Sequence, residues 1–289
     1  MLLKNTIEVT MKIILSVCGM AAVLFVLTIT AFLIVSGVPA MGEVGIAEFL
    51  FGTSWSPTSA EPSYGILPFI LSSLYGTAGA IIIGVPIGIM CAVFIAKTAP
   101  EKISGVMTEA VDLMSGIPSV VYGLVGMIAV VPFIQRVFNL PHGANMFTAI
   151  LVLAVMILPT VISVSKTAIR AVPREYEEGS LALGATKTET VFLVVVPAAK
   201  SGILTSVVLG IGRALGESMA IMMVSGNVAN MPRLFGSVRF LTTAVASEMS
   251  YSSGLHREAL FSIAFVLFVF ILIINLIINF IIKRGHKNE

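Results

Sequence analysis

Two oppositely charged residues, Arg213 and Glu217, stand inside an apolar stretch, in the segment GIGRALGES at 210–218. On a continuous helix, a spacing of four residues places both side chains on one face. Each charge costs roughly 2.5–3.5 kcal/mol at the centre of a membrane helix. The planar guanidinium can donate two parallel hydrogen bonds to an oxyanion, and Glu217 could hold Arg213 in place or balance its charge. The pattern favours recognition of an anion in a polar cavity; the alternative is a static ion pair that fixes helix packing.

Motifs for chemistry on a bound nucleotide or a metal are missing from the sequence. It contains no G-x-x-x-x-G-K-[ST] phosphate loop, no H-E-x-x-H and no G-x-S-x-G. Its three histidines, His142, His256 and His286, are far apart and fall in predicted loops or in the C-terminal tail. We therefore predict no catalytic residue, no metal site and no cofactor in this chain, so that any ATP would be bound by another subunit.

A second segment, about 170–200, has the character of a folded surface loop rather than a linker. Several acidic residues follow Pro173 in the run REYEEGSLALGAT at 174–186, as expected for the first turn of a helix. Gly184 is placed to cap the C-terminus of that helix. A second helix is expected to begin near Thr186 or Thr188 and to lead through Pro197 towards an apolar stretch. We predict a helix–turn–helix; a solvated amphipathic linker is the alternative.

The composition requires a lipid environment. Of the 289 residues, 57% are hydrophobic and 11% are charged, whereas soluble domains have about 45–50% apolar and about 25% charged residues. The net charge is only +2 and no long basic tract occurs, so we predict no nucleic-acid partner. Cys18 and Cys91 lie in apolar stretches, where a free cysteine packs as a small hydrophobe.

Six stretches are long and apolar enough to cross about 30 Å of hydrocarbon. They lie at about 13–38, 66–96, 110–134, 146–165, 201–226 and 259–282. The first is too long for the hydrophobic region of a signal peptide, so we expect it to be retained. The sequence predicts an all-α, multi-pass membrane protein that forms a single transmembrane domain over 1–289, with its core at about 66–282.

Basic residues indicate the orientation of these spans. Twelve fall on one side when the spans alternate: Lys4, Lys12, Lys97, Lys102, Lys166, Arg170, Arg174, Lys187, Lys200, Lys283, Arg284 and Lys287. Four fall on the other side: Arg136, Arg233, Arg239 and Arg257. The positive-inside rule then places both termini and the 170–200 loop in the cytoplasm.

Two further features bear on the spans and on the outer segment. The third span contains SGIPS at 115–119, which favours a proline kink; the alternative is a broken helix whose N–H groups face an anion. The only tryptophan, Trp55, lies in the acidic outer segment 39–65. We expect it to anchor the chain at the membrane interface, with contact to a partner as the alternative.

The spacing in the 170–200 loop resembles the cytoplasmic signature of permease subunits of ABC importers. That signature reads E-A-A, three residues, G, nine residues, I-x-L-P. It is matched here by Glu178, Gly184, Val194, Val196 and Pro197, with the small residues Gly179 and Ser180 in place of the alanines. The resemblance implies that this helix–turn–helix sits in a cleft of an ATPase and transmits its closure. It implies a coupling role for Glu178, Gly179, Ser180, Gly184 and Pro197.

Four other segments resemble the permeases of phosphate ABC importers, and the PstC type more than its PstA partner. They are FLFGTSWSP at 49–57, YGILP at 64–68, GIPSVVYG at 116–123 and GRALGE at 212–217. This resemblance covers about residues 45–280. It implies a six-span type I permease of the bacterial inner membrane, with Arg213 and Glu217 on the phosphate path.

The resemblance also implies partners: a second, PstA-like permease, two copies of a PstB-like ATPase that binds ATP, and a periplasmic or surface phosphate-binding protein. The residues alone leave other functions open. The chain could carry another oxyanion such as molybdate, tungstate or sulfate. It could be an ATP-independent secondary transporter in which Arg213 and Glu217 form a relay, or a membrane sensor that does not transport.

Overall fold

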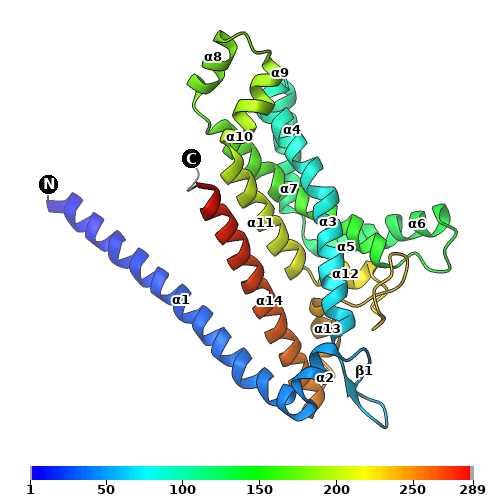
Figure 1. The fold of residues 1–289 in the computed structure, drawn as a ribbon. Helices are drawn as coiled ribbons and strands as arrows, with labels where there is room; N and C mark the ends of the chain where they lie inside the picture. Colours follow the sequence, from blue (N-terminus) through cyan, green and yellow to red (C-terminus); the bar gives the residue numbers. More distant parts are fainter. Residues whose placement is uncertain (1, 287–289) are drawn as a thin grey trace.

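The structure, a computed structural model, describes the backbone of residues 2–286, with side chains described for residues 8–277 and for Phe280. Lys287 lies outside the described residues, and so do the side chains of Lys4, Lys283 and Arg284. The helices form an elongated bundle (Figure 1). Helix α8 lies at one end of it, here called the α8 end, and strands β1 and β2 lie at the opposite end, here called the hairpin end.

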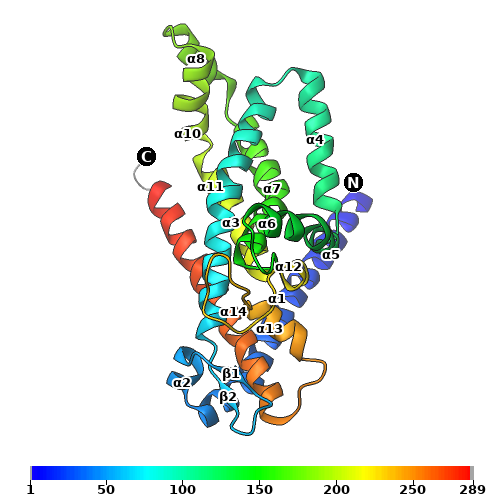
Figure 2. The ribbon, with the colours of Figure 1, turned by 90° about the vertical axis from the view of Figure 1, so that its right-hand side faces the viewer.

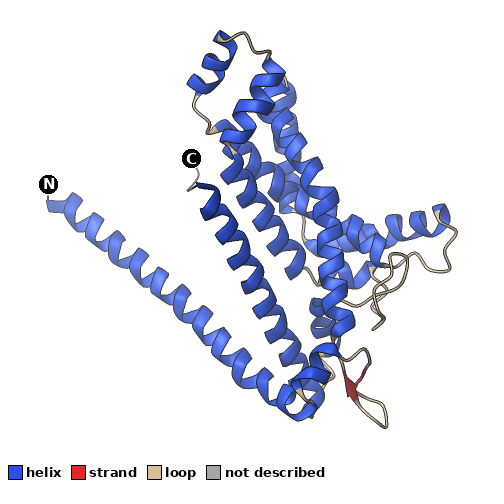
Figure 3. Ribbon diagram, in the orientation of Figure 1, coloured by secondary structure: helices blue, strands red, loops and turns tan. Residues whose placement is uncertain are grey.

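The chain is helical almost throughout (Figure 3). In chain order the elements are α1 (Leu2–Val44), α2 (Ile46–Phe51), β1 (Trp55–Ser56), β2 (Ser63–Tyr64), α3 (Leu67–Val93), the π-helix η1 (Phe94–Thr98), α4 (Glu101–Gly116), α5 (Ser119–Val125), the π-helix η2 (Gly126–Val130), α6 (Val131–Val137), α7 (Met146–Arg170), α8 (Arg174–Ala182), α9 (Lys187–Glu189), the π-helix η3 (Thr190–Val195), α10 (Val196–Ala198), α11 (Lys200–Gly216), α12 (Met219–Val224), α13 (Leu241–Glu248) and α14 (Gly254–His286).

Five helical segments, or six if one bent pair is a single span, are long and apolar enough to cross a membrane. Five are straight enough to count singly: Glu8–Val44, Leu67–Thr98, Ser119–Val137, Met146–Arg170 and Gly254–Ile277. The sixth is a bent pair, Lys187–Ala198 followed by Lys200–Gly216, whose two parts meet at 68°. The all-α membrane fold is confirmed, and the predicted number of six spans is reached if the bent pair is one span. The exceptions in the described backbone are the two-residue strands β1 and β2 and an isolated β-bridge between Gly226 and Val238.

The third predicted span, 110–134, straddles a break. Helix α4 ends at Gly116, the backbone of Ile117 and Pro118 is extended, and α5 begins at Ser119. Proline pushes the residue before it out of the helical region and lacks an N–H donor, which explains a stop at Ile117. The interruption is therefore wider than the proline kink that we expected. The apolar part of this span is Ser119–Val137 rather than 110–134.

The fifth predicted span, 201–226, is also interrupted. Helix α11 ends at Gly216, Glu217 has extended backbone angles (φ −75°, ψ 128°), and α12 begins only at Met219. Glycine is a poor helix former, and a polar side chain that can bond the next helix start favours a stop at this point. Each of the two interruptions is followed by a short helix, α5 after the first and α12 after the second.

Helix α7 forms the centre of the bundle and packs most extensively against α3. Glycines on α3 make this contact close. A Cβ at Gly79 would lie 2.7 Å from Ile150, one at Gly84 would lie 2.8 Å from Ile157, and one at Gly88 would lie 2.7 Å from Val161. Such distances leave no room for a side chain. Small residues therefore bring these two helices together, as they do in membrane helix pairs generally.

Helix α1 diverges from the rest of the bundle and leaves its apolar side chains exposed in this chain (Figure 1). It contacts α14 towards the hairpin end. There the Ser262 hydroxyl donates to the Gly37 carbonyl, and the rings of Phe32 and Phe261 meet edge to face with centroids 5.4 Å apart.

The hairpin end corrects two expectations. Trp55, which pairs with Tyr64 across the β1–β2 hairpin, is only 7% exposed, and its indole N–H donates to the Glu248 carboxylate. It is thus packed inside the chain rather than exposed as an interface anchor. His256 does not lie in a loop: it belongs to the first turn of α14 and is buried. Both side chains are held by residues distant in sequence, which local patterns do not report.

Candidate functional site

The two breaks in the spans are brought together. Helix α5, which follows the break at Ile117, packs against α12, which follows the break at Glu217 (Figure 2). A Cβ at Gly123 would lie only 2.7 Å from the Ala220 Cα, so this contact requires glycine. Irregular backbone at membrane depth is tolerated where protein surrounds it or where it lines a polar space. The site therefore begins where two interrupted spans meet.

Arg213 lies in the last turn of α11, half-buried, and turns towards α7. Its Nη1 donates to the Thr160 hydroxyl at 3.2 Å. The Tyr122 hydroxyl, within electrostatic reach of Arg213, donates to the Met114 carbonyl at 2.8 Å and so bridges the break between α4 and α5. Side chains from α5, α7 and α11 thus converge on one place, although 53 residues separate Arg213 from Thr160.

Glu217 does not pair with Arg213 in the part of the chain that the structure describes. Its carboxylate instead accepts a hydrogen bond from the Ala220 N–H at 2.9 Å, in the first turn of α12. Its backbone carbonyl accepts one from the Thr242 hydroxyl at 2.7 Å. The prediction that Arg213 and Glu217 share one helix face is wrong. Helix α11 ends at Gly216, and residues four apart lie on one face only while the helix continues. The hypothesis of a static ion pair on one helix face falls with it.

Arg213 therefore keeps most of its hydrogen-bonding capacity. A guanidinium has five N–H donors, and Thr160 is the only hydrogen-bond acceptor that the described side chains supply to it. The helix face beside it is open, since no described residue outside the adjoining turns of α11 comes within 4 Å of a Cβ at Gly212 or Gly216. A half-buried cation with unused parallel donors suits a small oxyanion.

The second candidate region is the loop that carries the signature. Helix α8 begins after Pro173, and Gly184 ends it with a left-handed φ of +91°. The turn is closed by hydrogen bonds from the Gly184 N–H to the Leu181 carbonyl at 3.0 Å and from the Ala185 N–H to the Ser180 carbonyl at 3.3 Å. Thr186 and Glu189 then form a capping box that opens α9. The predicted helix–turn–helix is confirmed.

Helix α8 buries none of its side chains in this chain. Glu178 and Gly179 are exposed, and no atom lies within 4 Å of a Cβ at Gly179 or Gly184. Leu183 is 91% exposed although it is a large apolar residue. An apolar tip beside acidic and small residues is typical of a surface that a partner covers.

Two polar side-chain contacts tie α8 to the rest of the chain. Glu177 forms an ion pair with Lys97 of η1, at the end of the second span, and the Ser180 and Thr190 hydroxyls lie 3.0 Å apart. Local sequence patterns do not single out Lys97 as a site residue, because its partner lies 80 residues away. Pro197 lies in α10, next to the bend that leads into α11.

Comparison with known proteins finds a matching family and several similar proteins. Residues 84–286 match the family described as "Binding-protein-dependent transport system inner membrane component". The chain is 37% identical over 282 residues to the probable ABC transporter permease protein YqgH of Bacillus subtilis, covering 96% of this chain and 91% of that one. It is 34% identical to the phosphate transport system permease protein PstC of Pasteurella multocida, covering 84% and 81% of the two chains.

Solved structures give the same fold. A structure of the MetNI methionine ABC transporter in an inward-facing conformation matches 76% of this chain and 96% of its own, with a TM-score of 0.59 and 17% identity. A bacterial alginate ABC transporter matches 92% and 93%, with a TM-score of 0.54 and 15% identity. These identities support the fold and leave the transported solute to other observations.

Proposed function

The chain belongs to the family of binding-protein-dependent transport system inner membrane components, and on that premise we propose that it is the PstC-type permease subunit of an ATP-driven phosphate importer. Relatives at 34% identity carry the PstC name and cover most of this chain, which supports phosphate as the solute. Binding and hydrolysis of ATP belong to a partner subunit, the PstB-like ATPase. The chain would form the translocation path together with a second, PstA-like permease.

The free donors of Arg213 carry this proposal. A phosphate oxygen pair fits the parallel N–H groups of a guanidinium better than any single acceptor does. One neutral hydroxyl, that of Thr160, holds the side chain in place, so a passing anion would not have to displace a carboxylate. Glu217, tied to α12, would shape the path at the break rather than neutralise Arg213.

The distribution of basic residues supports the orientation. The side of the chain that includes Lys97, Arg170 and Lys187 would face the cytoplasm, which puts the α8 end inside and the hairpin end outside. Helix α8 would then enter the ATPase cleft with Glu178, Gly179, Ser180 and Gly184 at the contact. The open face at Gly212 and Gly216 would receive the second permease, and the hairpin end would receive the solute-binding protein.

Movement would pass from the ATPase to the spans through the contacts of α8. When ATP closes the ATPase pair, the cleft displaces α8. Glu177 passes that displacement to Lys97 at the end of the second span, and Ser180 passes it to Thr190 in η3, ahead of Pro197 and the bend into α11. Because Arg213 lies at the far end of α11, rotation about that bend would change access to it.

Uptake of radiolabelled phosphate tests the function. The chain would be expressed with its candidate partner permease, ATPase and binding protein in cells without native phosphate importers, beside a set that lacks only this chain. We expect ATP-dependent uptake that needs this chain and that unlabelled phosphate, but neither molybdate nor sulfate, competes away. Competition by molybdate, tungstate or sulfate would move the substrate to another oxyanion. Uptake without ATP or the ATPase would instead favour a secondary transporter.

The variant Arg213→Gln tests the site. Hydrogen bonds to a charged group contribute about 1.5–3 kcal/mol each, so their loss should slow uptake about 10- to 100-fold. The exposed Arg136 of α6 offers a matched control, because Arg136→Gln removes the same charge away from the site and from the hairpin end. Co-purification of all subunits would show that the complex still assembles. Uptake at the wild-type rate in Arg213→Gln would remove this residue from the path.

A further inference from the structure

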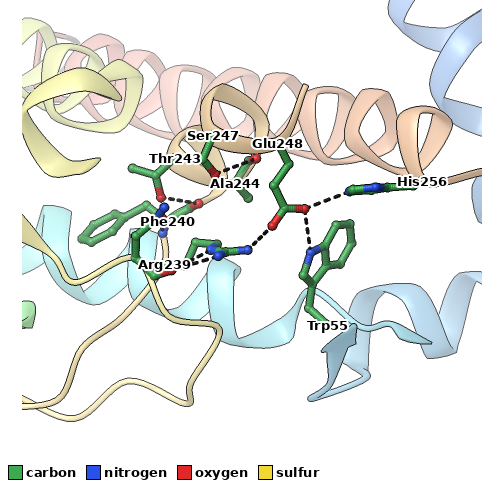
Figure 4. A network of polar contacts seen from close by, with 9 residues as sticks. Trp55, Arg239, Phe240, Thr243, Ala244, Ser247, Glu248 and His256 are labelled. Atoms are coloured by element: carbon green, nitrogen blue, oxygen red, sulfur yellow. Dashed lines mark hydrogen bonds and ion pairs between the residues drawn. The ribbon is translucent and has the colours of Figure 1, made fainter. Parts of the chain in front are cut away.

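The hairpin end contains a buried polar cluster, here called the outer cluster: Trp55, Arg239, Glu248 and His256 (Figure 4). Glu248, the last residue of α13, is 6% exposed. One carboxylate oxygen accepts from the Trp55 indole N–H at 3.0 Å and lies 2.9 Å from His256 Nε2, and the other pairs with the Arg239 guanidinium. A buried carboxylate with this many partners is fully satisfied and strongly held in place.

The cluster joins segments that are far apart in the sequence. Arg239 also donates from Nε and Nη2 to the Asn227 carbonyl, at 3.1 and 2.9 Å, and so closes the loop that follows α12. His256 connects the start of α14, and Trp55 connects the β1–β2 hairpin. Glu248 is therefore the common acceptor that holds the hairpin, the loop after α12, α13 and α14 in one arrangement.

A cavity of about 340 Å³ opens onto this cluster. Its walls include the hairpin residues 55–59 together with Arg239, Tyr251 and His256. Tyr251 is 65% exposed at this cavity. Burial and the charge of Glu248 raise the pKa of the Tyr251 hydroxyl, and Arg239 opposes the rise. The hydroxyl thus remains a donor at physiological pH, and a molecule that docks from this side meets hydrogen-bond donors in contact with the cluster.

The other end of α13 is bonded to the transport site. The Thr242 hydroxyl donates to the Glu217 carbonyl at 2.7 Å, and the Leu241 N–H donates to the Ser73 hydroxyl at 3.0 Å. Helix α13 has 8 residues, which makes it about 12 Å long, too short to bend appreciably. Glu217 is the residue whose side chain starts α12 and whose backbone ends α11 after Arg213.

We propose that Glu248 is a positioning residue for the Arg213 site and that it acts through α13. In this role the outer cluster holds α13 so that Thr242 keeps Glu217, and with it the end of α11, in place. The choice of partner rests on the proposed function: the solute-binding protein would use this connection. Its docking at the cavity displaces the hairpin or Tyr251, and α13 carries that displacement to the break beside Arg213.

The single tryptophan gives a direct test in the isolated full-length chain. Labelling with 5-fluorotryptophan yields one fluorine resonance, that of Trp55. Thr242→Val removes the hydrogen bond at the distant end of α13, and we expect it to shift or broaden that resonance. Thr205→Val is the control, because Thr205 is an exposed threonine of α11 that bonds only within its own helix. A Trp55 resonance unchanged by Thr242→Val would overturn the connection through α13.

A second test uses the assembled importer. ATPase activity is measured against the concentration of phosphate-loaded binding protein, for wild type and for Glu248→Gln. We expect the maximal stimulation to fall about fivefold while the half-saturating concentration stays within twofold, because docking persists and transmission fails. The control is Glu109→Gln, at an exposed carboxylate of α4 away from the hairpin end, which should match wild type.

Each other outcome has a definite meaning. A change in half-saturation alone would make Glu248 a docking contact, and unchanged kinetics would give it no role; both would overturn the proposal. If Glu248→Gln failed to assemble, Thr242→Val would carry the same measurement with the outer cluster intact. If the wild-type complex showed no stimulation by phosphate-loaded protein, the proposed function would fail, whereas the fluorine experiment would still decide the connection through α13.

Discussion

The α8 end and the hairpin end contain similar charged residues but differ in whether the chain itself buries and pairs them. At the hairpin end, Glu248 is buried and receives donors from Trp55, Arg239 and His256. At the α8 end, the acidic helix buries no side chain and depends on one ion pair and one hydroxyl contact. The first arrangement needs nothing from outside to satisfy its charges, whereas the second exposes small and apolar residues. Internal satisfaction thus marks a rigid support, and its lack marks a surface that awaits a partner.

This comparison also places the proposed phosphate site at Arg213 between a rigid end and a movable end. Arg213 lies in the last turn of α11, and the other end of α11 meets α10 at the 68° bend, close to the attachment of α8. The break after Arg213 is tied through Thr242 to α13 and the outer cluster. Motion that starts at α8 would therefore reach this site through α11, and motion that starts at the outer cluster would reach it through α13.

The largest expected difference between the ends is in stability. Glu248→Leu leaves the partly buried Arg239 without its carboxylate partner and the buried Trp55 indole N–H without an acceptor. Removal of one member of a buried pair costs about 3–5 kcal/mol. Glu177→Leu removes a pair at the edge of the protein, which should cost about 1 kcal/mol or less. Thermal unfolding of the purified chain in one detergent would compare the two. Equal losses of stability would mean that the α8 end is as firmly built as the hairpin end.

The next effect concerns the turn of the coupling loop. Gly184 has a φ of +91°, a conformation that costs an L-residue roughly 1–2 kcal/mol and a β-branched residue more. Gly184→Val should therefore distort the tip and reduce uptake about tenfold or more while the chain still inserts. Gly105→Val, at an exposed glycine of α4 with ordinary φ and nothing within 4 Å, is the control. Coupled uptake at the wild-type level in Gly184→Val would exclude this turn from coupling.

A smaller effect is expected for the attachment of α8. Lys97→Glu places two acidic side chains together. A partly exposed pair of opposite charges contributes about 1 kcal/mol, so uptake should fall about fivefold when it is lost. The double variant Lys97→Glu with Glu177→Lys restores opposite charges and should recover most of the activity. Failure of the reversed pair to recover uptake would show that Lys97 acts through something other than Glu177.

The smallest expected effect is a change in the protection of backbone amides from hydrogen exchange, measured without any substitution. Amides of α8 should exchange with deuterium faster than those of α13 in the isolated chain, because few buried contacts oppose local opening of α8. Addition of the ATPase should slow exchange in α8 and leave α13 nearly unchanged. Slow exchange in α8 before the ATPase is added would contradict the view that this end awaits a partner.

Much of the architecture follows from local patterns. Long apolar runs predict the spans because a bilayer sets their length. Pro173 and Gly184 predict the limits of α8, because proline suits a first helical turn and glycine suits a left-handed cap. These features depend on neighbouring residues along the chain. The close contact of Gly79, Gly84 and Gly88 with α7 depends instead on a distant segment, and the structure identifies it.

The sequence alone therefore determined the membrane class, the apolar spans and the helix–turn–helix of the 170–200 loop. Tertiary structure decided which charges meet. Arg213 and Glu217 are four residues apart and do not pair, because the backbone of Glu217 leaves the helix to start α12. Lys97 and Glu177 are 80 residues apart, and Trp55 and Glu248 are 193 apart, yet both pairs form. Spacing predicts contact only while a regular helix persists; where it stops, the packing of distant segments selects each partner.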